Sequence, residues 1–106
     1  MELSYSNPRM SAVIPDWPSG NKRVTARFEI EQTARGQRAT RTTDGEPKKH
    51  VFCPASRIVD GSDGRTYIAN LTPFGLISIM RGDLKFSHET IAPGDPRFAA
   101  ALCLFA

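Results

Sequence analysis

A concentration of cationic side chains between residues 34 and 50 is the feature of the sequence best suited to chemistry. Five basic and two acidic residues lie there, which accounts for the whole formal charge of +3 on the 106-residue chain. Arginine and lysine donate hydrogen bonds to phosphate oxygens, and neighbouring threonines add hydroxyl donors. We therefore expect a contact with nucleic acid, made by Arg35, Arg38, Arg41, Lys48 and Lys49 and supported by Arg27 and Arg57.

The spacing of the arginines limits how they can act together. Arg35, Arg38 and Arg41 recur at every third residue, whereas side chains of an extended strand alternate between two faces. The three guanidinium groups therefore cannot share one face, and contact on two sides of a ribbon is expected. The segment holds no aromatic residue on which a base could stack. A solvated loop, or a loop that docks on an acidic protein surface, is the alternative.

Other residue types that could do chemistry form weaker patterns. Two histidines and two cysteines offer four zinc ligands, but they do not form the two close pairs of a structural site: His50, Cys53, His88 and Cys103. Cys53 follows Val51-Phe52, which predicts a buried thiol rather than a nucleophile paired with a histidine. Phosphate-binding glycine loops and nucleophile motifs are absent from the sequence. We expect no enzymatic activity, metal or cofactor.

Alternation of apolar and polar residues predicts a mainly β fold. Over 23–33, Val24, Ala26, Phe28 and Ile30 share one face and charged residues share the other, as in an antiparallel sheet with one wet side. Further strands are expected at 51–53, 58–59, 67–71, 76–80 and 84–91. Asp-Gly pairs at 60–61 and 63–64 predict a hairpin between two of them. These segments indicate a small antiparallel barrel or sandwich of about five to six strands.

Less regular structure is expected at the ends and in the basic segment. Three prolines in residues 1–22 predict an irregular arm, anchored by a buried Trp17 rather than one exposed for stacking. Residues 34–50 hold too few apolar groups to be buried, so they should form a surface loop or a ribbon tip with a turn at Asp44-Gly45. We expect a turn at 81–83. A short C-terminal helix should follow Asp95-Pro96, with a terminal strand as the competing interpretation.

Length and composition indicate one globular domain over residues 1–106. Hydrophobic residues make up 40% and charged residues 24%, and no apolar run approaches the roughly 20 residues of a membrane helix. The N-terminal residues do not resemble an export signal, so we expect a cytoplasmic protein with Cys53 and Cys103 reduced and buried. The sequence predicts a non-enzymatic module that binds nucleic acid. The alternative is a small inhibitor or adaptor, of the type that mobile elements encode, that docks on an acidic protein surface. Exposed edge strands would allow a homodimer.

Overall fold

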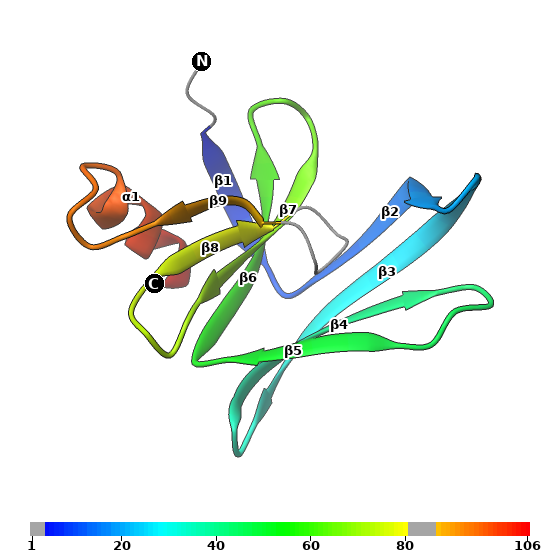
Figure 1. Cartoon of the computed structure of the whole chain (residues 1–106), viewed down its shortest axis with the longest axis horizontal. Helices are drawn as coiled ribbons and strands as arrows, with labels where there is room; N and C mark the ends of the chain where they lie inside the picture. The colour runs from blue at the N-terminus through cyan, green and yellow to red at the C-terminus, as the bar shows by residue number, and fades with distance from the viewer. Residues whose placement is uncertain (1–3, 81–86) are drawn as a thin grey trace.

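The computed structural model describes residues 4–80 and 87–106, which form two antiparallel sheets (Figure 1). One sheet has the order β1-β6-β7-β8-β9, with β1 (Tyr5–Arg9), β6 (Ala55–Gly61), β7 (Thr66–Leu71), β8 (Ile77–Met80) and β9 (Ser87–Ile91). The other has the order β2-β3-β4-β5, with β2 (Ser11–Ser19), β3 (Lys22–Thr33), β4 (Gly36–Thr43) and β5 (Lys49–Cys53). Helix α1 (Phe98–Leu102) and a 3-10 turn (Cys103–Phe105) end the chain.

The mainly β fold and the short C-terminal helix are confirmed. The expected number of strands was too low, because the described residues alone contain nine. The two sheets do not close into a barrel. The predicted turn at 81–83 and the start of the strand predicted at 84–91 lie outside the described residues, while β9 confirms the end of that strand.

Two continuous segments pass from one sheet to the other by bending. β1 leads into β2 through Met10, and β5 leads into β6 through Pro54. β1 pairs with β6, whereas β2 pairs with β3 and β5 with β4, so each segment contributes a strand to both sheets. Sheets that cross at a steep angle are joined by strands that switch sheets at such bends. The result is an open sandwich with one of its two apolar clusters between the sheets.

The prediction of an irregular arm over residues 1–22 was wrong, because this part of the chain contains the strands β1 and β2. Both are edge strands, where a proline removes an N–H that the sheet ladder does not need. Asn7 and Asp16 adopt positive φ angles of 55° and 57°, within the stretches where each strand shifts its pairing register. The prolines therefore mark edges and irregular pairing rather than an absence of strands.

The core consists of two apolar clusters. The first lies between the β2–β5 sheet and the β6–β7 hairpin and contains Trp17, Ala26, Phe28, Ile30, Ala39, Ile58 and Ile68. The second lies under the C-terminal helix and contains Val59, Tyr67, Ala69, Ile77, Ile79, Ile91 and Leu104. The rings of Trp17 and Phe28 meet edge to face, with centroids 5.2 Å apart. The predicted burial of Trp17 is confirmed.

The cysteines are both free, and only one is buried as expected. Cys53 lies in the interior at the end of β5, whereas Cys103 is exposed. The expectation for Cys103 was wrong because the C-terminal 3-10 turn directs Leu104 into the core and leaves its neighbour outside. The predicted hairpin around the Asp-Gly pairs is confirmed by β6 and β7, with Gly64 at φ 79° in the turn.

Three buried polar side chains connect β4, β6 and β7 at the bend beside Pro54. The Ser56 hydroxyl donates to Asn70 Oδ1 at 2.6 Å, and the Ser56 backbone N–H donates to Gln37 Oε1. Arg57 Nη1 donates to the same Gln37 oxygen at 3.0 Å and to the Ser56 carbonyl at 2.7 Å. Buried polar groups satisfied in this way fix one arrangement of the strands around them.

An ion-pair cluster holds the C-terminal helix against β9. Arg97 Nη1 lies 2.5 Å from Glu89 Oε2, and Arg97 Nη2 lies 2.9 Å from Asp95 Oδ2. The hydrogen bonds from the Arg97 side chain and backbone lower the pKa of Asp95 to about 2. An unfolded aspartate has a pKa of about 3.9. Because the folded value is lower, the stability contributed by Asp95 is present above about pH 4 and is lost as the pH falls toward about 2.

We expect Asp95→Asn to lower the free energy of unfolding at neutral pH and to have little effect at about pH 2, where the native carboxylate is largely protonated in the unfolded chain and partly in the folded one. Urea unfolding at the two pH values measures the difference. Asp44→Asn, in the exposed turn before β5, is the matched control. An Asp95→Asn effect of the same size at both pH values would contradict the assigned role of the carboxylate.

Candidate nucleic-acid interface

One face of the β2–β5 sheet points away from the core, and strand parity decides which residues it carries. Along β3, the buried positions 26, 28 and 30 alternate with exposed Arg27, Glu29 and Glu31. The antiparallel register places Arg38 opposite Glu31 and Thr40 opposite Glu29. β5 completes this surface, which we call the outer face: Arg27, Glu29, Glu31, Arg38, Thr40, Thr42, His50 and Phe52.

Two aromatic rings and two arginines meet at one end of the outer face. Phe52 lies opposite Arg38 in the β4–β5 pairing. The guanidinium carbon of Arg35, from the turn between β3 and β4, lies 4.6 Å from the centroid of the Phe52 ring. The His50 ring meets Phe52 edge to face, with centroids 5.4 Å apart. We call these four residues the aromatic–arginine cluster.

The turn that carries Arg35 has a fixed shape. The Thr33 hydroxyl donates to the Gly36 carbonyl at 2.8 Å and accepts a hydrogen bond from the Arg35 backbone N–H at 3.2 Å. Gly36 has a φ of 114°, and a Cβ atom at this position would lie 2.6 Å from the Cys53 carbonyl oxygen. Only glycine meets both conditions, so the backbone beneath Arg35 is held close to the end of β5.

The outer face also contains two side-chain atoms for which residues 4–80 and 87–106 provide no hydrogen-bond partner. Arg38 Nη2 pairs with Glu31 Oε1 at 2.7 Å, and both side chains are well exposed. Arg38 Nε and Thr40 Oγ1 are buried and have no hydrogen-bond partner among the described residues. Buried polar groups are nearly always paired, so these two groups, one within the aromatic–arginine cluster and one opposite His50, distinguish this end of the sheet.

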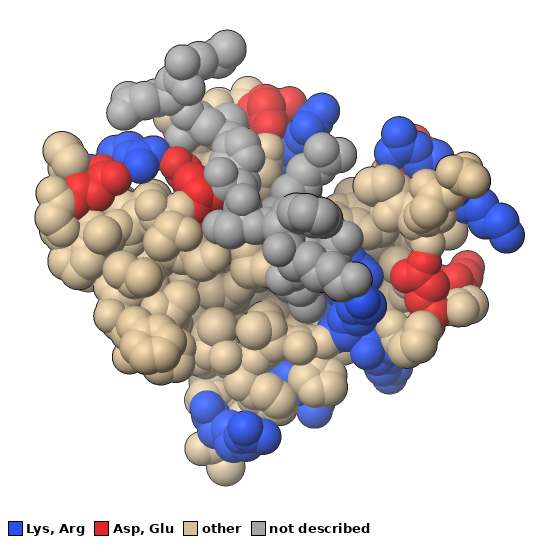
Figure 2. Space-filling view, in the orientation of Figure 1, with Lys and Arg blue, Asp and Glu red and all other residues tan. Residues whose placement is uncertain are grey.

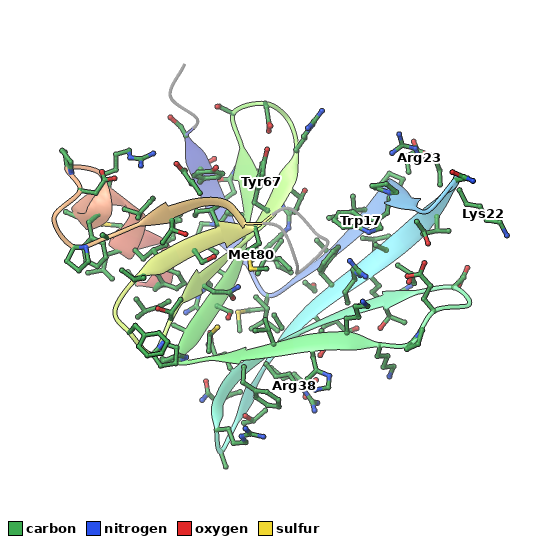
Figure 3. The ribbon with its side chains drawn as sticks, viewed as in Figure 1. Trp17, Lys22, Arg23, Arg38, Tyr67 and Met80 are labelled. Carbon is green, nitrogen blue, oxygen red and sulfur yellow. The ribbon has the colours of Figure 1, made fainter. Side chains whose placement is uncertain are left out.

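The structure divides the seven predicted contact residues among several places. Arg27 and Arg38 lie on the outer face, and Arg35 joins them from the turn. Arg41 and Lys49 are opposite one another on the other face of the sheet, the inner face, which packs against the core. Arg41 is only 6% exposed, with its guanidinium carbon 5.8 Å from the centroid of the Trp17 ring. Figure 3 shows Trp17 and Arg38 on opposite sides of β4 and β5.

Two further predicted contacts lie away from the outer face. Lys48 belongs to the turn before β5. Arg57 lies at the bend beside Pro54, where its side chain donates hydrogen bonds to Gln37 and to the Ser56 carbonyl. The sequence predicted that the three arginines could not share one face of a strand. This is confirmed for Arg38 and Arg41, which lie on opposite faces of β4. The expectation that residues 34–50 form only a surface loop or ribbon tip was wrong for 36–43. These residues form the internal strand β4, whose inward-facing side chains are buried because β3 and β5 pair on either side of it: Gln37, Ala39, Arg41 and Thr43.

Basic and acidic residues are interspersed over the face seen in Figure 2. Lysines and arginines form separate groups along the side of the β2–β5 sheet, and acidic residues lie among them. On the outer face itself, Glu29 and Glu31 offset part of the positive charge. Any nucleic-acid contact here therefore relies on local geometry as well as on charge.

His50 and Cys53 do not form the pair that their spacing suggested. His50 lies on the outer face, whereas Cys53 is buried on the inner face of the same strand. Burial raises the pKa of the Cys53 thiol, which favours its protonated form. No group of three metal-ligating side chains occurs in the part of the chain that the structure describes, to which the side chain of His88 does not belong.

A cavity of about 260 Å³ lies on the other sheet, between β1, β9 and the C-terminal helix. Ile91, Ala101 and Leu104 contribute apolar walls, and Glu89 and Arg97 lie at its polar end. These two charged groups bond to one another, so the polar end is occupied by the ion pair that anchors the helix. The cavity is explained by the docking of this helix.

Phe52 and His50 were missed as contact residues because they lie outside the run of arginines. The predicted turn at Asp44-Gly45 brings this segment back beside β4 but does not give the register. A two-residue turn at these positions would place Phe52 opposite Gln37, whereas the observed pairing is symmetric about Gly45 and places Phe52 opposite Arg38 and His50 opposite Thr40. His50 is the last residue of the basic segment, and Phe52, which lies beyond it, adds the phenyl ring that residues 34–50 lack.

Comparison with known proteins adds no family to these observations. No protein-family model, curated protein or solved structure matches this chain. The helices within residues 4–80 and 87–106 are too short to cross a membrane. The functional argument therefore rests on the residues of the outer face and their geometry.

Proposed function

We propose that this protein binds single-stranded nucleic acid, without enzymatic activity, through the outer face of its β2–β5 sheet. The observation that carries the proposal is the aromatic–arginine cluster, in which Arg35 lies over Phe52 and Arg38 is the cross-strand neighbour of that ring. Unpaired bases stack on aromatic rings and on guanidinium planes, and sheet surfaces are a common support for this contact.

The arginines would contact the phosphate backbone on either side of the stacked base. Arg27 is exposed on β3. Arg38 is also accessible to solvent, and its guanidinium group is paired with Glu31. An exposed ion pair of this kind contributes only about 0.2–1 kcal/mol, so a phosphate can replace the carboxylate at small cost. Glu29 and Glu31 would repel a backbone that crossed β3, which favours a path along β4 and β5.

The alternative is a small inhibitor or adaptor that docks the same cations on an acidic protein surface. The rings beside the arginines, of which His50 is exposed and Phe52 half-buried, favour bases, because an acidic surface would require only charge. We propose a cytoplasmic location, which two free thiols support. A pull-down after nuclease treatment separates the two functions, since a protein partner would survive the digestion and a nucleic-acid contact would not.

Fluorescence anisotropy with a labelled single-stranded oligonucleotide tests the proposal. We expect Phe52→Leu to weaken binding by about 1–3 kcal/mol, the usual contribution of one stacked base. Phe74→Leu is the matched control, because Phe74 is 88% exposed on the β7–β8 turn of the other sheet. Equal affinity of the two variants for the oligonucleotide would overturn the assigned role of Phe52.

A further inference from the structure

The edge strands of the two sheets differ in how they are protected against pairing with another chain. Within the described residues, β1, β9, β2 and β5 are the edges. β1 and β2 contain prolines and register shifts, and the β8–β9 pairing is also shifted. β5 contains no proline and pairs with β4 without a shift. β5 is protected only by its short length and by Lys49, so it is the edge best able to add a further strand.

We propose that β5 pairs in antiparallel fashion with β5 of a second copy of this chain. Pro47 and Pro54 flank the strand and cannot donate to a ladder, which confines the pairing to residues 49–53. When all five residues are used, the two-fold axis passes through Val51. Lys49 then faces Cys53 and His50 faces Phe52 of the second copy, so no like charges are opposed.

The second copy completes the aromatic–arginine cluster. His50 and Phe52 already touch on the outer face of one copy, and the pairing places the same two rings beside them on the same face. Arg35 and Arg38 of each copy would flank the four rings in a continuous sheet of eight strands. This consequence rests on the proposed function: a single strand of nucleic acid crossing the axis would meet a stacking surface that one copy supplies only in half.

The strength of the pairing follows from its size. A contact of five residues per chain is smaller than a standard protein interface, so the dimer should be weak when no nucleic acid is present. A strand that binds both halves at once would stabilise it, because the second contact is then made within one complex. The oligomeric state should therefore depend on protein concentration.

Sedimentation of the native chain without nucleic acid tests the pairing directly. We expect the mean mass to rise from that of a monomer toward that of a dimer between about 10 µM and about 1 mM, the range of weak association. Backbone amides of β5 that point away from β4 should exchange more slowly at the higher concentration. A constant monomer mass over this range would overturn the proposal.

Disulfide cross-linking locates the contact. In a Cys103→Ser background, mild oxidation of Val51→Cys should give a covalent dimer, because residue 51 faces itself across the axis. Val13→Cys, which replaces a 56% exposed residue on the opposite edge of the same sheet, should remain monomeric. Equal cross-linking of both variants, or none in Val51→Cys under conditions where the native chain dimerises, would exclude β5 as the contact.

These readouts are independent of the proposed function. Mass, exchange and cross-linking are all measured without nucleic acid, so they can support the dimer even if no oligonucleotide binds. If the dimer fails, the difference between Phe52→Leu and Phe74→Leu still reports on stacking by a single copy.

Discussion

The Arg35→Ala/Arg38→Ala double variant will bind a single-stranded oligonucleotide more weakly than the native chain, and its affinity will depend less steeply on salt. Each phosphate contact adds about 0.7 to the slope of log affinity against log salt concentration, so loss of two contacts should reduce the slope by about 1.4. Arg35 also lies over the Phe52 ring, and its removal takes away a guanidinium plane on which a base can stack.

A control variant must remove the same charge from another part of the molecule. Arg9 and Arg65 are exposed on the other sheet and its β6–β7 turn, so Arg9→Ala/Arg65→Ala matches the change in net charge. Anisotropy titrations at several salt concentrations should give this variant a slope close to that of the native chain. If both double variants reduce the slope equally, binding follows net charge rather than the outer face.

Phe28→Ala will lower the free energy of unfolding by about 3–5 kcal/mol, as expected for truncation of a buried aromatic side chain. Phe28 is 1% exposed and meets Trp17 edge to face at the centre of the first core cluster. A domain of this size has a total stability of about 5–15 kcal/mol, so the loss is a large fraction of the whole.

Urea unfolding measures this loss, and Phe74→Ala is the control because the same atoms are removed from an 88% exposed turn. If Phe28→Ala does not fold, Phe28→Leu should show a smaller loss by the same mechanism. A cost for Phe28→Ala no larger than that for Phe74→Ala would contradict the position of Phe28 in the core.

The parts of the fold that could be predicted from sequence are those set by neighbouring residues. Alternation over 23–33 defines β3, and the Asp-Gly pairs define the hairpin of β6 and β7. The interpretation of residues 1–22 failed because proline is compatible with a strand only at an edge. Whether a strand lies at an edge depends on partners far away in the sequence, such as the pairing of β1 with β6.

The candidate site could be predicted only in part, for a similar reason. Strand parity separates Arg38 from Arg41, and this was visible in the sequence. The burial of Arg41 beside Trp17 and the bonds of Arg57 to Gln37 depend on contacts between segments distant in sequence. Phe52 lies opposite Arg38 because of the β4–β5 register. A shift of the turn by one residue would place Phe52 opposite a residue whose side chain is on the other face of β4. The local pattern therefore identified the charges but not the rings beside them.

The bends at Met10 and Pro54 tie the two sheets together through one strand pairing and one shared core. A cut at Pro54 would separate β1 from its partner β6 and would remove Ile58 and Ile68 from the core cluster that they share with the β2–β5 sheet. The molecule should accordingly unfold as one cooperative unit, without a stable half. A ligand that tightens the outer face would then slow the opening of the distant β6–β9 strands as well, although it touches none of them.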